Sequence, residues 1–297
     1  MSQSSQVLAR FFNPPKNLQH LFTHFYYVEF GGEPGRAVTD YLHPEWGNLR
    51  LFQGNPPEAY ALDGTHFPAT RFSITGPSSQ ALRFEIAPPS RMWGIGLMPL
   101  GWARYIAADA ADYANLVVDA LTDPDFAQFL PLAEGLFRPV ADVESEYGRI
   151  AAFFSALNDR PIQDEARIAA LHQALHDPEV KTVSDLVART GCNSRKLERI
   201  SHRVLGFPPK VLLRRQRLLR SLAEYILDPS LKWIGALDGH YHDQAQFVKD
   251  FREMMGMTPS QYAAIDKPIL GSFMGERARF SGSPVQGLHP PGNGGDV

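Results

Sequence analysis

A row of charged side chains at helical spacing is the first feature of this 297-residue sequence that could do chemistry. Within residues 182–206, Leu197, Ile200 and Val204 share one face of a predicted helix, so the residues between them face outward. The outward side chains are Arg195, Lys196, Glu198, Arg199, His202 and Arg203. Arginine pairs bidentately with guanine and glutamate accepts from the N4 amine of cytosine, so this helix suits the major groove of DNA.

Residues 243–259 repeat the arrangement about 50 residues later. Phe247 and Phe251 face inward on the predicted helix. The outward side chains that could touch DNA are Gln244, Gln246, Lys249 and Arg252. Glutamine reads adenine, and lysine reads guanine or phosphate. Both segments end alike, in Gly206-Phe-Pro-Pro209 and Gly256-Met-Thr-Pro259, and we interpret them as an internal duplication.

Each row is predicted to lie on the second helix of a helix-turn-helix. In the first unit, a short helix over residues 183–189 stops at Gly191, and Asn193 or Ser194 caps the second helix. In the second unit, Asp243 can cap the corresponding helix. The sequence therefore predicts two such units in tandem.

One helix is predicted between the units, over residues 208–227, with a proline at its start where a missing N–H does no harm. At about 1.5 Å per residue this rod is roughly 30 Å long. Successive major-groove faces on one side of B-DNA lie about 34 Å apart, so the connector suits two recognition helices in adjacent turns. Its cations could contact phosphates or stay solvated, and we expect at least one phosphate contact. They are Arg214, Arg215, Arg217 and Arg220.

Residues 180–263 resemble the AraC-type family of bacterial transcription regulators. The resemblance is densest in Asp243-Gln-Ala-Gln-Phe-Val-Lys-Asp-Phe-Arg252 and in the following Gly256-Met-Thr-Pro259, and Leu197, Arg199 and residues 206–209 match the first unit. It implies base-reading positions at Arg195, Glu198, Arg199, Gln244, Ala245, Gln246 and Lys249. It also implies double-stranded DNA as a partner, a homodimer, and RNA polymerase if the protein is an activator.

One stretch departs from the family pattern. The family places Ala-Leu-x-x-Gly-Tyr before the second recognition helix, whereas this chain has Ala236-Leu-Asp-Gly-His-Tyr241, with His240 in place of the glycine. A bulky residue at a turn that needs positive φ is costly unless Gly239 takes that role. We therefore expect the second unit to dock less regularly or to contribute less affinity.

The first 125 residues are predicted to form a β-rich domain, because β-branched and aromatic runs alternate with Gly/Pro turns. The predicted strands are 22–30, 49–52, 72–75, 82–86 and 92–98. More weakly, this part resembles the cupin-like sensor domains of the same family, with its best match over residues 93–104. The aromatic residues expected in the core, or alternatively around a small apolar or aromatic effector, are Phe25, Tyr27, Trp46, Phe52, Phe72 and Trp93.

Residues 126–178 are predicted to be a helical linker that could serve in dimerisation. The apolar residues that mark its two helices are Ile150, Phe153, Phe154 and Leu157, then Ile168, Leu171 and Leu175. These helices could pack on the sheet, on each other or on a second copy of the chain. The last segment, 267–297, is rich in Gly and Pro at its end, and we expect a mostly disordered tail.

The charge is divided in the same way. The whole chain carries a net −3, but residues 1–178 carry −8 and residues 179–266 carry 14 basic and 10 acidic side chains, or +4. This asymmetry indicates that the segment 179–266 faces a polyanion.

No catalytic residue, metal site or cofactor is predicted. His240-Tyr-His242 lacks a further ligand at suitable spacing, and His43-Pro-Glu45 is better interpreted as a turn than as half of a metal site. The single cysteine, Cys192, excludes a disulfide framework and fits a reducing cytosol. No segment approaches the roughly 18 apolar residues of a membrane span, and the N-terminus has no secretion signal.

Together these features predict an α+β, multidomain chain. The expected domains are a β-rich, cupin-like barrel or sandwich over residues 1–125, the linker 126–178, an all-α double helix-turn-helix over 179–266, and the tail 267–297. The predicted function is that of a cytoplasmic, sequence-specific DNA-binding transcription regulator controlled by a small molecule or partner at its first domain. The alternative is a cupin-like enzyme or small-molecule binding protein whose C-terminal helices mediate assembly.

Overall fold

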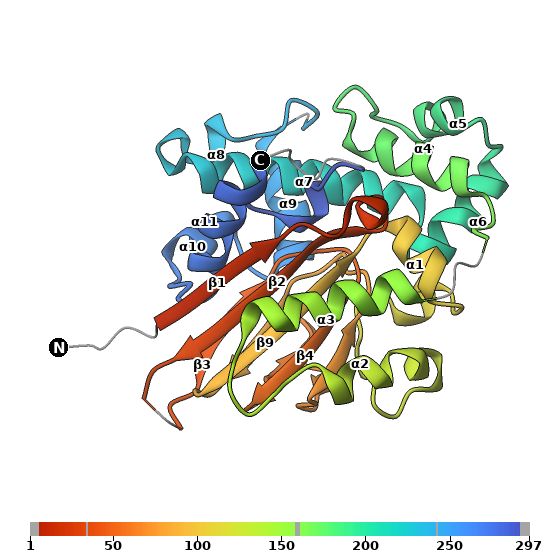
Figure 1. Ribbon diagram of the computed structural model, residues 1–297. Coiled ribbons are helices and arrows are strands. Elements are labelled where there is room, and N and C mark those ends of the chain that lie inside the picture. Colours follow the sequence, from red (N-terminus) through yellow and green to blue (C-terminus); the bar gives the residue numbers. More distant parts are fainter. Residues whose placement is uncertain (1–5, 34, 158–160, 242, 292–297) are drawn as a thin grey trace.

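The computed structural model describes residues 6–33, 35–157, 161–241 and 243–291. Strands dominate the first 119 residues and helices the rest, and most of the helices form one layer above the sheets, while others lie along a face of the larger sheet (Figure 1). The predicted α+β class, with a β-rich first part and an all-helical last part, is confirmed.

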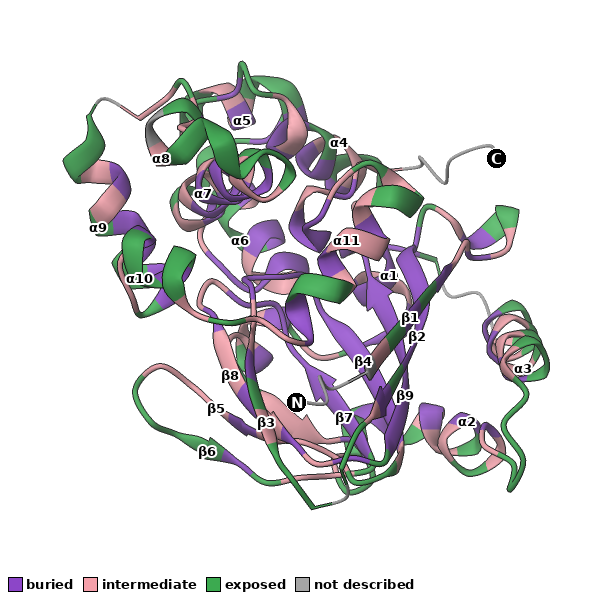
Figure 2. Cartoon of the chain, turned by 90° about the vertical axis from the view of Figure 1, so that its left-hand side faces the viewer, coloured by how far each residue is buried: buried purple, intermediate pink, exposed green. Residues whose placement is uncertain are grey.

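Two antiparallel sheets face each other in the first part of the chain (Figure 2). In spatial order, the six-stranded sheet contains β1 (Gln6–Phe12), β2 (Phe22–Gly31), β9 (Ser90–Leu97), β4 (Asn48–Gly54), β7 (Phe72–Thr75) and β10 (Val117–Asp119). The four-stranded sheet contains β3 (Val38–Leu42), β8 (Leu82–Ile86), β5 (Glu58–Tyr60) and β6 (His66–Phe67). The five predicted strands are present, and the six aromatic residues expected in the core are all buried.

Helices between residues 99 and 176 cover the outer face of the larger sheet and the base of the helical layer. They are α1 (Pro99–Tyr105), α2 (Leu130–Gly135), α3 (Val143–Ala156) and α4 (Glu165–His176). On α3, Phe154 packs on Phe22, and the buried carboxylate of Glu146 accepts hydrogen bonds from Trp93 and Arg91 at 2.7 Å each. Of the packing arrangements left open, α3 therefore packs on the sheet, whereas α4 packs on α1, α5 and α7.

Six helices make up the segment that was predicted to hold the tandem units. They are α5 (Val183–Thr190), α6 (Ser194–Leu205), α7 (Pro209–Leu227), α8 (Lys232–Gly235), α9 (Gln244–Met255) and α10 (Pro259–Ala264). In Figure 1, α4, α5 and α6 lie on one side of the helical layer and α8, α9 and α10 on the other, with α7 between them. One apolar core runs from Trp93 in the sheet to Leu197 on α6, so the domain bounds at 125, 178 and 266 remain a prediction.

The prediction of a mostly disordered tail is wrong for residues 267–291. This segment contains α11 (Leu270–Ser281) and the short 3-10 helix η5 (Gln286–Leu288). Leu270, Met274 and Val285 are buried, because apolar residues before the Gly/Pro-rich end have a core to pack on. Residues 292–297 lie outside the described residues.

The described part of the chain holds no helix long and apolar enough to cross a membrane. Within that same part, no group of three or more His, Cys, Asp or Glu side chains is placed to hold a metal ion. Four further 3-10 helices connect these elements: η1 (Lys16–Leu18), η2 (Ala110–Tyr113), η3 (Pro124–Phe129) and η4 (Pro229–Leu231).

Candidate nucleic-acid interface and ligand pocket

The first unit has the local geometry that the sequence predicted. The Thr182 side chain and Asp185 form a capping box at the start of α5, which ends at Gly191 with φ of 62°. The side chain of Asn193 accepts a hydrogen bond from the Lys196 N–H and caps α6. Leu197, Ile200 and Val204 are buried on the inner face of α6, as predicted, and Cys192 is a buried turn residue. The opposite face of α6 is therefore available to a partner.

The outer face of α6 is divided into two rows of side chains. Arg195 and Glu198 are exposed, and the half-buried His202 lies 3.6 Å from Glu198. The second row, Lys196, Arg199 and Arg203, faces the residues that precede α4. The structure thus brings all six predicted residues of this unit together on one helix surface, and their contacts with DNA remain a prediction.

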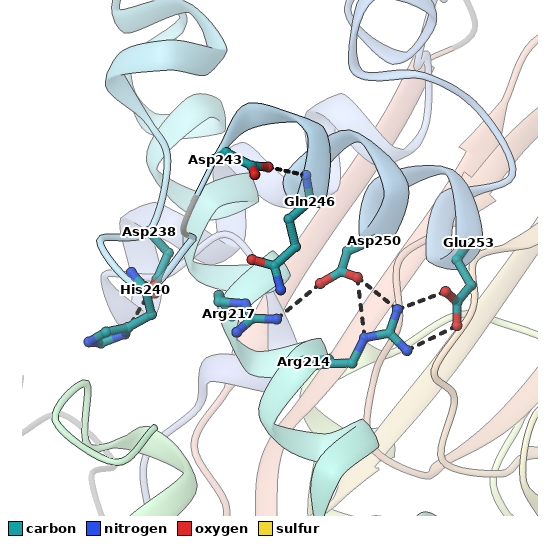
Figure 3. A network of polar contacts seen from close by, with 8 residues as sticks. All are labelled: Arg214, Arg217, Asp238, His240, Asp243, Gln246, Asp250 and Glu253. Atoms are coloured by element: carbon teal, nitrogen blue, oxygen red, sulfur yellow. Dashed lines mark hydrogen bonds and ion pairs between the residues drawn. The ribbon is translucent and has the colours of Figure 1, made fainter. Parts of the chain in front are cut away.

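The second unit repeats this construction on α9. Asp243 accepts a hydrogen bond from the Gln246 N–H at 2.7 Å and caps the helix (Figure 3). Phe247 and Phe251 are buried as predicted. The outward residues of α9 are the exposed Gln244, Lys249 and Arg252 and the half-buried Gln246. These four side chains lie on one helix, and their contacts with DNA also remain a prediction.

The position of the Arg215 side chain contradicts the phosphate contact that was predicted for it. Its side chain is fully buried, its guanidinium stacks 3.9 Å from the ring of Trp46, and its Nη1 donates to the carbonyl oxygen of Ser78 at 2.9 Å. Arg215 shares the buried face of α7 with Leu212 and Leu219, so helical periodicity turns it inward. It joins the connector helix to the sandwich instead of facing solvent.

The other three arginines of α7 pair with acids of the second unit, and Figure 3 shows two of them, Arg214 and Arg217. Arg214 pairs with Asp250 and Glu253 at 2.7 Å each, and Arg217 pairs with Asp250 at 3.1 Å. Arg220 forms an ion pair with Asp238. Their charges are already matched by these acids, so the free chain does not present them as open phosphate contacts.

The irregular turn before α9 differs from the expectation. Neither Gly239 nor His240 has a positive φ, and Lys232 does, with φ of 52°. His240 instead donates its backbone N–H to Asp238 at 2.9 Å, and its Nδ1 lies 3.0 Å from the same carboxylate (Figure 3). The turn is therefore closed by Asp238 and not by left-handed backbone, and the predicted loss of affinity stays untested. His242, the second member of the His-x-His pair, lies outside the described residues.

A mainly apolar cavity of about 90 Å³ lies between the two sheets. Its apolar wall includes Val28, Phe52, Phe84, Ile86 and Met92. One end is polar, because Glu45 and Arg50 line it and form a buried ion pair at 2.5 Å. A small molecule with an apolar body and a polar group matches this lining.

The segment that was expected to be disordered contributes to the same pocket. Ile269, Leu270 and Phe273 line it, and the buried carboxylate of Asp40 accepts hydrogen bonds from the Ile269 and Leu270 N–H groups at 2.8 Å each. The sequence carried one signal for this, since Ile269 and Phe273 are spaced as one helix face. The Gly/Pro-rich residues that follow concealed it.

The pocket wall contacts α7 through Glu45, and neighbouring segments contact the helical layer as well. The carbonyl oxygen of Glu45 accepts from Arg215 Nη1 at 3.4 Å. Farther along α7, Gln216 Nε2 donates to the carbonyl oxygen of Gly287 at 2.9 Å. His43, expected in a turn, is buried with its Nε2 2.8 Å from the hydroxyl of Tyr262 on α10, and burial lowers the pKa of His43 to about 3. The pocket wall is thus in direct contact with the helical layer.

Among solved structures, the chain is similar to ToxT from Vibrio cholerae in its P21 crystal form, with 11% sequence identity, coverage of 88% of this chain and 98% of ToxT, and a TM-score of 0.43. ToxT from Vibrio cholerae O395 bound to (E)-4-(8-methylnaphthalen-1-yl)but-3-enoic acid has 12% identity, the same coverage and a TM-score of 0.42. The AraC-like transcriptional activator CuxR has 14% identity over 73% of this chain and 87% of its own, with a TM-score of 0.26. These likenesses are too distant to carry an argument about function.

No curated protein matches the chain. Residues 186–265 match the family model described as a helix-turn-helix domain. This match covers α6, α7, α8 and α9 completely, and thus both recognition helices and the connector between them. The chain therefore contains a helix-turn-helix domain at residues 186–265, which includes α6 and α9.

Proposed function

We propose that the chain binds specific double-stranded DNA through α6 and α9 and that a small, mainly apolar molecule in the sandwich pocket controls this binding. The observation that carries the proposal is the position of Glu45. Its side chain lines the pocket, and its backbone carbonyl accepts a hydrogen bond from Arg215 of the connector α7. A ligand that repositions Glu45 would therefore shift α7, the helix that sets the distance between the two recognition helices.

In this proposal the base contacts of the first unit come from Arg195, Glu198 and Arg199. In the second unit they come from Gln244, Gln246 and Lys249. Exposure on the outer faces of α6 and α9 supports these assignments, with Gln246 half-buried. Arg215 has no part in phosphate binding.

We further propose that the protein acts in the cytoplasm as a homodimer and not as an enzyme, and that it contacts RNA polymerase if it activates transcription. A dimer would place four recognition helices on a two-fold operator, which matches the symmetry of most dimeric DNA-binding proteins. The pocket is lined mainly by apolar side chains, which supports binding of a ligand in preference to catalysis on it.

The test uses the full chain and DNA from its own promoter region, with random DNA of equal length for comparison. Nile red serves as a neutral, apolar fluorescent probe of the pocket, and DNA affinity is measured by fluorescence anisotropy with and without apolar metabolites that displace it. Ala59→Phe fills the pocket, because Ala59 is buried in its wall. Ala152→Phe, at an exposed position of α3, is the matched control.

We expect wild type and A152F to bind Nile red and to change DNA affinity severalfold with a displacing ligand. A59F is expected to lose both responses and still bind DNA. If A59F binds Nile red like wild type, the ligand site is wrong. If wild type does not prefer its promoter over random DNA, specific DNA binding itself is wrong.

A further inference from the structure

A single carboxylate, that of Asp164, lies among cations of the first recognition helix. Asp164 Oδ1 is 2.8 Å from Lys196 Nζ, and Asp164 Oδ2 is 3.8 Å from Arg199 Nη2 and 3.9 Å from Arg203 Nη2. Arg167, on α4 itself, adds a fourth cation at 3.1 Å from Oδ1. Asp164 lies outside the matched domain, which begins at residue 186. The acid that faces this part of α6 is thus supplied by another segment of the chain.

The three cations on α6 form one stripe along the helix. Residues 196, 199 and 203 follow the three- and four-residue spacing that places side chains above one another. The preceding residue, Gln163, also contacts the stripe, because Arg203 donates to its side-chain oxygen at 2.7 Å and to its carbonyl oxygen at 2.8 Å. The pair 163–164 thus covers one row of the proposed DNA-reading face.

The Asp164 carboxylate is turned away from its own helix. Asp164 is the N-cap residue of α4, a position where aspartate usually accepts a hydrogen bond from the first turn, but its side chain makes no such bond. Its backbone has φ of 61° and ψ of 27°, the left-handed region that glycine, asparagine and aspartate tolerate best. The direction of the carboxylate is therefore not explained by helix capping.

The contacts on Asp164 Oδ2 are those of an exchangeable anion. Oδ2 is buried, and no described residue donates a hydrogen bond to it. Arg199 and Arg203 are held near it at ion-pair distance only, and the Arg199 side chain is 62% exposed. Both guanidiniums can turn toward a DNA phosphate without breaking a hydrogen bond to this oxygen. A carboxylate flanked by lysine and arginine presents the charge and oxygen spacing that these cations would meet in a phosphate.

We propose that Asp164 is a specificity-determining residue: it occupies the cationic stripe of α6 in place of a DNA phosphate and lowers binding to nonspecific DNA. This inference rests on the proposed role of α6 as a recognition helix. Nonspecific binding comes from cations that neutralise phosphates, so an internal anion competes most strongly with it. Base contacts of Arg195 and Glu198, which are not among the described residues paired with Asp164, add free energy at the specific site that the competitor does not reduce, and the specificity ratio rises.

The variants Asp164→Asn and Asp164→Gly test the proposal, because both remove the charge and both residues accept φ of 61°. Thermal unfolding by circular dichroism identifies which of the two keeps the fold. Asp142→Asn is the matched control, with the same change of charge at the N-cap of α3, where Asp142 caps Ser145 and no cation of α6 pairs with it in the described residues.

We measure the affinity of the full chain for random DNA and for promoter DNA between 50 and 200 mM salt. Each additional phosphate contact steepens the slope of log affinity against log salt by about 0.9. We expect D164N or D164G to bind random DNA severalfold tighter, with a slope steeper by roughly one contact. The ratio of promoter to random affinity should fall, and D142N should match wild type.

Three outcomes overturn the proposal. Weaker binding to both DNAs would make Asp164 a residue that positions the cations for contact. Unchanged binding would make the ion pairs irrelevant to DNA, and an equal gain in D142N would reduce the effect to net charge. Failure of the proposed function is distinct from all three, because wild type would then show no preference for its promoter.

Discussion

In the first helix-turn-helix unit the cations lie on the recognition helix and the acid that faces them comes from outside, whereas in the second unit these roles are reversed. Lys196, Arg199 and Arg203 of α6 face Asp164. On α9, Asp250 and Glu253 face the arginines of the connector α7. The first unit therefore keeps its charge at the surface where DNA would dock, and the second uses its charge to attach itself to α7.

The supports beneath the two units also differ. The first unit rests on α4, where the rings of the buried His172 and the half-buried His176 lie 4.9 Å apart. The second packs on α7 through a shared apolar core and through ion pairs, in which Asp250 is buried and Glu253 is half-exposed. The two units should therefore differ in how their stability responds to acid and to loss of an ion pair, and in how DNA affinity responds to loss of a base contact. The expected effects follow from the largest to the smallest.

The largest effect should come from acid. Burial lowers the pKa of His176 to about 3 and that of His172 well below its ordinary value of 6.5. Both rings are then neutral in the folded chain, while the unfolded chain takes up protons below pH 6.5. Stability should therefore be unaffected above pH 6.5 and fall as the pH drops to 5, by about 2 kcal/mol for His176 and by a comparable amount for His172.

Urea unfolding at pH 7 and pH 5 measures this loss. His176→Gln should weaken the pH dependence, because it removes one of the two rings that stay neutral in the folded chain. Equal unfolding free energies of the wild type at the two pH values would contradict the prediction and would show that His172 and His176 are not held neutral in the folded chain.

The second effect concerns the attachment of α9 to α7. Asp250→Ala removes a carboxylate that is 4% exposed and leaves Arg217 without its acid, so we expect a loss of about 3 kcal/mol in unfolding free energy. Glu253→Ala removes a half-exposed carboxylate from the same Arg214 and should cost about 1 kcal/mol or less. Thermal and urea unfolding of the two variants give the comparison, and an equal cost would show that burial of Asp250 does not matter.

The third effect separates the two units in DNA binding. Arg199→Ala should cost about 1–3 kcal/mol in binding to promoter DNA and relax the preference for one base pair. Gln244→Ala, an exposed residue of α9, should cost less, because a neutral amide contributes no electrostatic attraction to phosphate. Affinities at one salt concentration decide the order, and a larger loss for Q244A would assign the dominant contact to the second unit.

Local signals were sufficient to predict both recognition helices. The apolar spacing of Leu197, Ile200 and Val204, the caps Asn193 and Asp243, and the glycines after each helix are all determined within one or two turns. Other strands escaped prediction because their signals are weak. The edge strand β1 (Gln6–Phe12) has no turn residues before it, and β6 (His66–Phe67) has two residues.

Contacts between distant segments could not be predicted in the same way. Nothing near Asp164 in the sequence indicates that cations 32 to 39 residues later would surround it. Arg215 is a different case, because its position on the stripe with Leu212, Leu219 and Leu222 already indicated the buried face of α7. The charge of Arg215 predicts an exposed side chain, whereas its helical spacing predicts a buried one. A planar guanidinium can be buried when it stacks on a ring and donates to carbonyls.

The smallest effect tests whether the C-terminal segment supports α7 beneath the second unit, where Val285 shares a core with Leu218 and Phe251. Gly271 lies exposed within α11 with no atom within 4 Å of an added Cβ, so Gly271→Ala should stabilise a folded helix by about 0.5–1 kcal/mol. Gly287→Ala should instead destabilise the chain by about 1 kcal/mol or more, because its Cβ would lie 2.4 Å from Leu219 Cδ1. If the segment is disordered, both variants should unfold at temperatures close to that of wild type. Opposite shifts would establish that the C-terminal segment is packed beneath the second unit, as α4 is packed beneath the first.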